Sequence, residues 1–147
     1  MILNFIGLFI LLTGFIIGLG AVTVIDLHGF LGRKSKYWTE ATTRTHKVTK
    51  PMIWIGILLI IIGEIIFFRN DSSNILIYLL AISIILIING IFLSFSVSPY
   101  MIQREQEGRQ AELLPKSWQN KIMISLLFSD LGWWSSLVVI VWYLVSI

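Results

Sequence analysis

Long apolar runs dominate this chain and are separated by short polar segments. Four runs, at about residues 2–25, 51–68, 75–97 and 122–145, reach the roughly 20 residues that a helix needs to cross a bilayer. A backbone in lipid must be helical or belong to a closed barrel. The isoleucine and leucine runs lack the apolar–polar alternation that a barrel strand requires. The pattern predicts an all-α fold, a four-helix transmembrane bundle, with residues 1–147 as a single membrane domain.

The polar segments at about residues 26–50 and 98–121 are expected to be helical extensions on the inner side of the membrane. Ser35 is a residue type that caps helices. After it, mostly apolar residues recur at the three- and four-residue steps of a helix, at Tyr37, Ala41, Thr45, Val48, Met52 and Ile55. This spacing predicts that the second helix begins near Lys36 and passes through Pro51, which would kink it. The first helix is expected to continue to about Gly32.

The chain contains a short internal similarity. Residues 20–29 (GAVTVIDLHG) lie 70 positions before residues 90–99 (GIFLSFSVSP), and Gly63 lies 69 positions before Gly132. Parallel repeats in membrane proteins relate two halves by an axis along the membrane normal. We therefore predict two helical hairpins related as a parallel repeat.

Small residues form one face of the first apolar run, at Gly7, Gly14, Gly18 and Gly20. The spacing Gly14-x-x-x-Gly18 permits the close approach of two helix backbones. Packing within the chain is the expected use of this face, and a dimer interface is the alternative.

Charge is sparse and unevenly distributed along the chain. Only 13% of the residues are charged, against roughly 25% in soluble domains, and 56% are hydrophobic. Ten of the eleven Lys and Arg residues lie between the first and second runs or between the third and fourth, and Arg69 is the other. By the positive-inside rule, these two connections face the cytoplasm and both termini lie outside the plasma (inner) membrane. Topology therefore explains the net charge of +3 without a nucleic-acid partner, and the bilayer is the expected surrounding.

The absence of cysteine from the sequence limits the chemistry that the chain can support. It excludes disulfides, thiolate zinc sites, iron–sulfur clusters and covalent haem attachment through C-x-x-C-H. A metal or haem would have to use His, carboxylate or Met ligands.

Six polar residues stand out in the apolar runs or at their inner ends. They are Asp26, His28, His46, Glu64, Asn89 and Asp130. An ionisable residue in lipid is by default a candidate functional site, because its transfer there is costly.

Asp26, His28 and His46 form the sharpest cluster, because a hairpin of the first two helices would bring them near the connecting bend. Asp26 and His28 are two residues apart, about 200° around a helix, so all three converge only where the helix unwinds locally. One interpretation is an interfacial pairing of Asp26 with His46 or with a nearby basic residue (Arg44 or Lys47). A second is a metal site of Asp26, His28 and His46 for Zn, Cu, Fe or Ni. A third is a haem b held by His28 and His46.

Asn89 and Asp130 are expected at nearly the same depth, since each lies about ten residues from the inner end of its run. A hydrogen bond between them, donated by a protonated Asp130, would serve as a structural clasp or as a step for a proton or cation. Glu64 is expected to reach the outer headgroups, where it would be solvated or paired with Arg69.

A family resemblance rests on four strings, GLGAVTVIDLHGFLGRK, RTHKVTKPMIWIGILLIIIG, INGIFLSFSVSP and SDLGWWS. Together they resemble small uncharacterised four-helix bacterial membrane proteins that are grouped with CopD-like domains. The matching positions are Thr23, Asp26, His46, Trp54, Asn89, Gly90, Val97–Pro99, Trp133 and Trp134. The resemblance covers nearly the whole chain and implies the fold more than an activity. The broader group is associated with copper handling and haem-bearing relatives, whereas this chain has two His and four scattered Met.

Three functions are compatible with these features. The first is a non-enzymatic accessory or scaffold subunit, in contact with a membrane-protein partner or a second copy of the chain. The alternative is an electron-transfer module that binds haem b or a transition metal through His28 and His46 at the cytoplasmic end. The third is a small transporter or proton-coupled carrier that uses Asn89 and Asp130. No nucleophile–base arrangement or phosphate loop stands out in the sequence, so we favour a non-enzymatic role.

Overall fold

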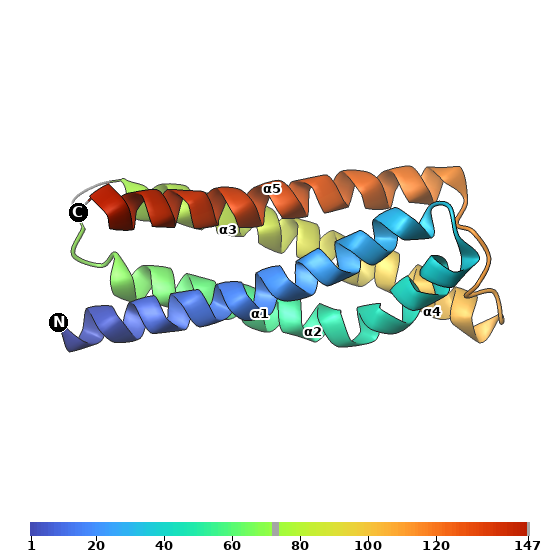
Figure 1. The fold of residues 1–147 in the computed structure, drawn as a ribbon, viewed down its shortest axis with the longest axis horizontal. Coiled ribbons are helices and arrows are strands. Elements are labelled where there is room, and N and C mark those ends of the chain that lie inside the picture. The colour runs from blue at the N-terminus through green and yellow to red at the C-terminus, as the bar shows by residue number, and fades with distance from the viewer. Residues whose placement is uncertain (72–73, 147) are drawn as a thin grey trace.

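Four long apolar crossings run the length of the molecule in the computed structural model, which describes residues 1–71 and 74–146 (Figure 1). The elements in chain order are α1 (Ile2–Gly32), α2 (Lys36–Phe67), α3 (Ile75–Phe92), the π-helix η1 (Leu93–Val97), α4 (Ser98–Gln106) and α5 (Lys116–Ser146). The third crossing is formed by α3, η1 and α4 together, and each of the four is long and apolar enough to span a membrane. The predicted all-α, four-helix transmembrane bundle is therefore confirmed in the described part of the chain.

The two ends of the bundle differ in what they carry. The start of α1 and the end of α5 lie at one end, together with the end of α2 and the start of α3 (Figure 1), and we call this the terminal end. The turn between α1 and α2 and the connection between α4 and α5 lie at the other end (Figure 1). We call it the basic end, because most of the Lys and Arg residues belong to these connections and the adjoining helix turns.

The hairpin of α1 and α2 has the boundaries that the periodicity predicts. Helix α1 ends at Gly32, and α2 begins at Lys36 and continues through Pro51. Ser35 precedes α2 in an extended conformation, but its side chain makes no capping hydrogen bond. The turn is closed by Thr39, whose hydroxyl donates to the carbonyl of Gly32 at 2.7 Å.

The predicted extension over residues 98–121 is wrong as a continuous helix. Helix α4 ends at Gln106, and α5 begins at Lys116. Gly108 adopts a φ of 70°, the left-handed region that ends helices, and Pro115 stands immediately before α5. The helical period of the sequence did not reveal this break because Gly108 stands between charged residues and Pro115 follows a single apolar pair, Leu113 and Leu114, which is too short to show a period.

A buried arginine holds the connection between α4 and α5 in place. The side chain of Arg104 is only about 4% exposed, and its Nη2 donates to the carbonyls of Arg109 and Glu112 at 3.1 and 2.8 Å. A guanidinium presents several donors in a fixed fork, so one side chain satisfies two backbone acceptors.

Glycine allows α1 and α2 to pack with their backbones almost in contact. A Cβ at Gly14 would lie 2.8 Å from the backbone nitrogen of Ile60, and a Cβ at Gly63 would lie 2.5 Å from that of Leu11. Gly20 differs, because a Cβ there meets nothing within 4 Å. The predicted small-residue face is therefore used for packing within the chain at Gly14, while Gly20 faces away from the other helices.

Helix α5 joins this hairpin through one large side chain. Trp133 is 1% exposed, and its ring packs directly on Gly18 and edge-on against Phe15, with ring centroids 6.0 Å apart. Gly132, the residue before Trp133, accommodates Leu86 of α3. The core of the bundle therefore lies where Trp133 and Leu86 meet the glycines of the neighbouring helices.

The π-helix η1 interrupts the third crossing beside α2. The indole Nε1 of Trp54 donates to Ser94 Oγ at 3.1 Å, and the same ring packs over Gly90. Single π-helical turns inside α-helices occur frequently at functional sites. The predicted repeat pairs residues 90–99, which contain η1, with residues 20–29, which are regular α-helix; the repeat itself stays a prediction.

Candidate functional site

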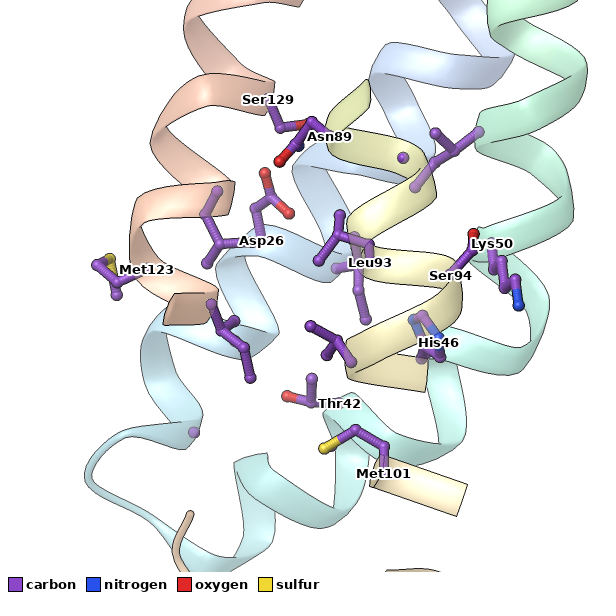
Figure 2. Close-up of a pocket in the computed structure, with 18 of the residues that line it drawn as sticks. Asp26, Thr42, His46, Lys50, Asn89, Leu93, Ser94, Met101, Met123 and Ser129 are labelled. Atoms are coloured by element: carbon purple, nitrogen blue, oxygen red, sulfur yellow. The ribbon is translucent and has the colours of Figure 1, made fainter. Parts of the chain in front are cut away.

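A cavity of about 90 Å³ lies inside the half of the bundle nearer the basic end (Figure 2). All four crossings contribute to its wall, which is mainly apolar and includes η1. Its polar side chains within the bundle include Asp26, His46, Lys50, Asn89, Ser94 and Ser129. An apolar pocket with a few convergent polar groups is the usual form of a binding site.

Asp26 is the carboxyl group that α1 presents to this cavity. Its residue is 8% exposed, and its side chain points towards Asn89 and Ser129 (Figure 2). The carboxyl of Asp130 on α5 lies close enough to interact with it. Two like charges at close range disfavour each other. Helices α1 and α5 therefore bring two carboxyl groups together beside the cavity.

The predicted hydrogen bond between Asn89 and Asp130 is wrong. Asn89 Nδ2 donates to the carbonyl of Ser125 at 3.1 Å, and Ser125 Oγ donates to Asn89 Oδ1 at 2.6 Å. Both ends of the amide are thereby satisfied by one residue of α5. Ser125 lies five positions nearer the basic end than Asp130. The prediction failed because depth counted along two sequence runs does not determine which turns of the two helices face each other.

His46 and Lys50 line the cavity from α2, one helical turn apart (Figure 2). Lys50 Nζ donates to Ser98 Oγ at 3.4 Å. The Nε2 atom of His46 is buried and has no hydrogen-bond partner among the described residues. This wall therefore offers a cation and an imidazole to a molecule in the cavity.

The predicted pairing of Asp26 with a nearby basic residue is wrong for both candidates. Arg44 pairs with Glu40 on the same helix at 2.6 Å. Lys47 pairs with Glu105 of α4 at 2.7 Å. Both basic side chains lie on the exposed face of α2, whereas Asp26 points into the bundle.

His28 takes no part in the cavity wall. Its ring packs against Trp38, in the first turn of α2, with centroids 5.2 Å apart. Helix α1 remains regular through this region, so the 200° between positions 26 and 28 turns the two side chains to different sides. Local unwinding, which convergence of Asp26, His28 and His46 requires, does not occur.

These residues do not fit the metal or haem sites that the sequence suggests. Within residues 1–71 and 74–146, no three His, Asp or Glu side chains are grouped so that they could hold a metal ion. A bis-histidine haem would need both imidazoles at one cavity, and only His46 lines it. Pockets for ligands of that size measure roughly 300–1,000 Å³. Haem or metal binding by Asp26, His28 and His46 stays a prediction that this geometry does not support.

Glu64 lies in the bundle interior, so its predicted place at the headgroups is wrong. The residue is 0% exposed, and its Oε2 accepts a hydrogen bond of 3.4 Å from Ser83 on α3. Arg69 instead donates to the carbonyl of Ile66 at 2.8 Å. Ser83 was missed by sequence reasoning, although it is an isolated hydroxyl in an isoleucine-rich run. The short distance from Glu64 to the end of its helix suggested that the carboxyl could reach water. It does not, because Glu64 lies on the face of α2 that points into the bundle.

Comparisons with protein-family models, with curated proteins and with solved structures found no match to this chain. Its function must therefore be argued from the cavity and the buried polar groups. They can bind and orient a molecule within a small protein whose four apolar helices are suited to a lipid environment.

Proposed function

We propose that this protein is a non-enzymatic membrane module that binds an anionic amphiphile, with one apolar chain in the cavity and the head group towards the basic end. The supporting observation is the combination of an apolar, largely enclosed cavity with cationic side chains, Arg33 and Lys50, in its wall. Membrane proteins seldom place a lysine beside an internal apolar cavity unless the amine has a partner or a function.

The size of the cavity favours a slender chain. Its volume of about 90 Å³ is smaller than the engineered apolar cavities of about 150 Å³ that admit benzene. Ile57, Leu86 and Leu126 contribute aliphatic surface, and Trp54 and Trp133 contribute aromatic surface. The lining suits a hydrocarbon chain, and the volume admits only a short part of such a chain and excludes a planar macrocycle.

The head group is expected at the basic end. The cavity wall continues in that direction through Gly32, Arg33 and Thr39, at the turn between α1 and α2. Under the positive-inside rule this end faces the cytoplasm and the termini face outward. The proposal therefore places the ligand in the cytoplasmic leaflet of a bacterial plasma membrane, where anionic head groups also meet the basic connections.

Binding of a brominated fatty acid to the detergent-solubilised protein tests this proposal. Bromine quenches tryptophan emission at short range, and two of the six tryptophans, Trp54 and Trp133, line the cavity. We expect a saturable component of quenching from these two residues. A brominated alcohol of the same chain length serves as the uncharged comparison and is expected to bind more weakly.

Two glycine variants on α1 provide a matched pair for this measurement. Gly29 lines the cavity, and a Cβ there makes ordinary contact with Leu126 at 3.4 Å, so Gly29→Phe is expected to fill the space. Gly20→Phe adds the same ring where a Cβ meets nothing within 4 Å. We expect Gly29→Phe to abolish saturable quenching and Gly20→Phe to preserve it. Equal quenching in both variants would refute a ligand in this cavity.

Lys50→Gln tests the head-group part of the proposal. Hydrogen bonds to charged groups contribute about 1.5–3 kcal/mol, so loss of the ammonium should weaken fatty-acid binding by about tenfold or more. Binding of the alcohol should change little. An equal loss for both probes would assign Lys50 a structural role, through Ser98, rather than recognition of an anion.

The roles suggested by the sequence remain separate proposals. An accessory subunit would be identified by a membrane-protein partner that co-purifies in stoichiometric amount, and a homo-oligomer by its mass in detergent. Membership of the CopD-like group predicts copper or haem in the purified protein, which elemental analysis and an absorption spectrum would detect. A carrier that uses Asn89 and Asp130 predicts altered flux in proteoliposomes after Asp130→Asn.

A further inference from the structure

A second buried polar site lies towards the terminal end of the bundle, apart from the cavity. Glu64 of α2 is 0% exposed, and Ser83 of α3, 2% exposed, donates to its Oε2. The other carboxyl oxygen, Oε1, is fully buried and has no hydrogen-bond partner within the described residues. A carboxyl group with one long hydrogen bond and one unpartnered oxygen is poorly prepared to hold a full negative charge.

Apolar side chains surround this carboxyl group on the helix that carries it. Gly63, the preceding residue, packs on the backbone of Leu11 in α1. Ile60, one turn towards the basic end, is 2% exposed, and Phe68, one turn towards the terminal end, is 1% exposed. Residues four apart lie on the same helix face, so both cover the face that Glu64 occupies.

Helix α5 contributes a third buried polar group at a similar depth. Ser136 is 2% exposed, and its Oγ has no partner in the part of the chain that the structure describes. Gly132, one turn before it, packs against Leu86 and Ile82 of α3. Since α3 and α5 run in opposite directions, Ser136 lies one turn nearer the terminal end, at about the level of Leu79 and Ser83.

Aromatic rings separate this site from the aqueous phase at the terminal end. Phe68 packs on Tyr143 with ring centroids 5.0 Å apart, and Phe67 packs on the same tyrosine at 6.4 Å. The Tyr143 hydroxyl donates to Asp71 in the connection after α2. Glu64 is four residues from Phe68, or about 6 Å along the helix axis. The carboxyl is thus shielded from lipid and water but lies about one helical turn from polar groups at the surface.

We propose that Glu64 is an intramembrane proton-binding site, distinct from the amphiphile cavity, which exchanges its proton with the aqueous phase at the terminal end. Ser83 contacts the carboxyl, and Ser136 supplies a further hydroxyl at this depth. Other titratable or charged groups near this end include Arg69, which donates to the Ile66 carbonyl, and Asp71, which accepts from Tyr143. Tyr78 and the amino group of Met1 also lie at this end (Figure 1) and are exposed. A permanently neutral structural role would be served equally by glutamine.

Labelling with dicyclohexylcarbodiimide tests the site in the intact protein reconstituted into liposomes. The reagent partitions into apolar regions and reacts with a protonated carboxyl: the carboxyl oxygen bonds to the carbodiimide carbon, and the proton moves to nitrogen. Peptide mass mapping then reports the modified residue. We expect an adduct at Glu64 whose yield falls as the pH is raised, because the proton leaves to bulk water. Glu112, exposed in the α4–α5 connection, is the comparison residue and should give no stable adduct.

Matched variants separate proton binding from folding. Glu64→Gln is isosteric and can still accept from Ser83, so it should retain the wild-type helical spectrum and lose the adduct. Ser83→Ala removes the donor to the anionic form and should increase labelling at a given pH, whereas Ser83→Thr keeps the hydroxyl and should restore wild-type labelling.

Three results would overturn the proposal. Absence of an adduct at Glu64 in the folded protein would show that the carboxyl is not available as an acid. A yield independent of pH would show a fixed, structural proton. Suppression of labelling by sodium ions at constant pH, with potassium as the ionic-strength control, would show that a metal cation rather than a proton occupies the site.

Discussion

Replacing Gly63 by alanine tests whether close contact between α1 and α2 holds the bundle together. A Cβ at this position would lie 2.5 Å from the backbone nitrogen of Leu11, 2.6 Å from its Cα and 2.7 Å from its Cβ. Two of these are backbone atoms, so no side-chain rotation relieves the clash, and the helices must move apart. Carbon atoms pack best at about 3.5–4.0 Å, which requires a local separation of about 1 Å.

The expected cost follows from this displacement. A gap of about 1 Å forfeits roughly a quarter to a half of the dispersion energy of each contact along the seam. In lipid no hydrophobic driving force compensates for this loss, because helix association there depends largely on van der Waals packing. Overpacking costs about 1–3 kcal/mol, and the better helix propensity of alanine returns up to about 1 kcal/mol. We expect Gly63→Ala to lower the free energy of unfolding by about 1–2 kcal/mol.

Gly20→Ala is the matched control for this prediction. A Cβ at position 20 meets nothing within 4 Å, so only the propensity term applies, and the variant should be as stable as the wild type or slightly more stable. Reversible unfolding in mixed micelles, with increasing mole fraction of dodecyl sulfate and far-ultraviolet circular dichroism as readout, gives the free energies. If Gly63→Ala proved as stable as Gly20→Ala, the close seam would not exist as described.

Three further predictions concern polar contacts. Asn89→Ala and Ser125→Ala should each lower the unfolding free energy by roughly 0.6–1.7 kcal/mol, the range of interhelical hydrogen bonds in membranes, with the larger loss for Asn89→Ala because Ser125→Ala keeps the backbone carbonyl that accepts from Asn89; the double variant should cost little more than Asn89→Ala alone, and additive losses would contradict this contact. Arg104→Lys should increase proteolysis of the α4–α5 connection, because one ammonium cannot reproduce the fork that donates to the carbonyls of Arg109 and Glu112; unchanged cleavage would argue against that anchor. The hydrogen bond from Arg109 lowers the pKa of Glu112, so the ionised carboxylate stabilises the ordered α4–α5 connection at pH values above the ordinary pKa of glutamate. This stabilisation is lost as acid protonates the carboxylate, so proteolytic cleavage of the connection should rise below about pH 4. The rise should be smaller in Glu112→Gln, which has no carboxylate to protonate.

Some features of the fold followed directly from local sequence. The lengths of the apolar runs predicted four crossings, and the mostly apolar positions from Tyr37 to Ile55 predicted a helix that begins near Lys36 and passes through Pro51. These predictions succeeded because helix formation in lipid depends on hydrogen bonds within one segment. The break between α4 and α5 was missed, because neither the charged residues around Gly108 nor the short pair Leu113 and Leu114 before Pro115 shows a period that distinguishes a helix from a loop.

The candidate site was less predictable, because its geometry depends on rotation and register between helices. Asp26 was identified as an ionisable residue in an apolar run, and the 200° separation from His28 correctly warned that the two would diverge. Two contacts could not be predicted without knowing which turns of α1, α3 and α5 face one another. They are the interaction of Asp26 with Asp130 and the hydrogen bonds between Asn89 and Ser125. A shift of one residue rotates a helix position by about 100°, enough to exchange one neighbour for another.

The sequence by itself determined the helical character of this protein, the number of its crossings and the gathering of its cations at one end, because hydropathy and charge act on each segment independently. Only the tertiary structure decided that Glu64 is sealed beneath Phe68, that His46 lines a cavity while His28 packs against Trp38, and that Lys50 lies beside apolar space. These features depend on how tightly each pair of helices approaches. Glycines draw α1 and α2 together, while Trp54 and Trp133 hold the other helices farther apart and line the cavity that remains between them.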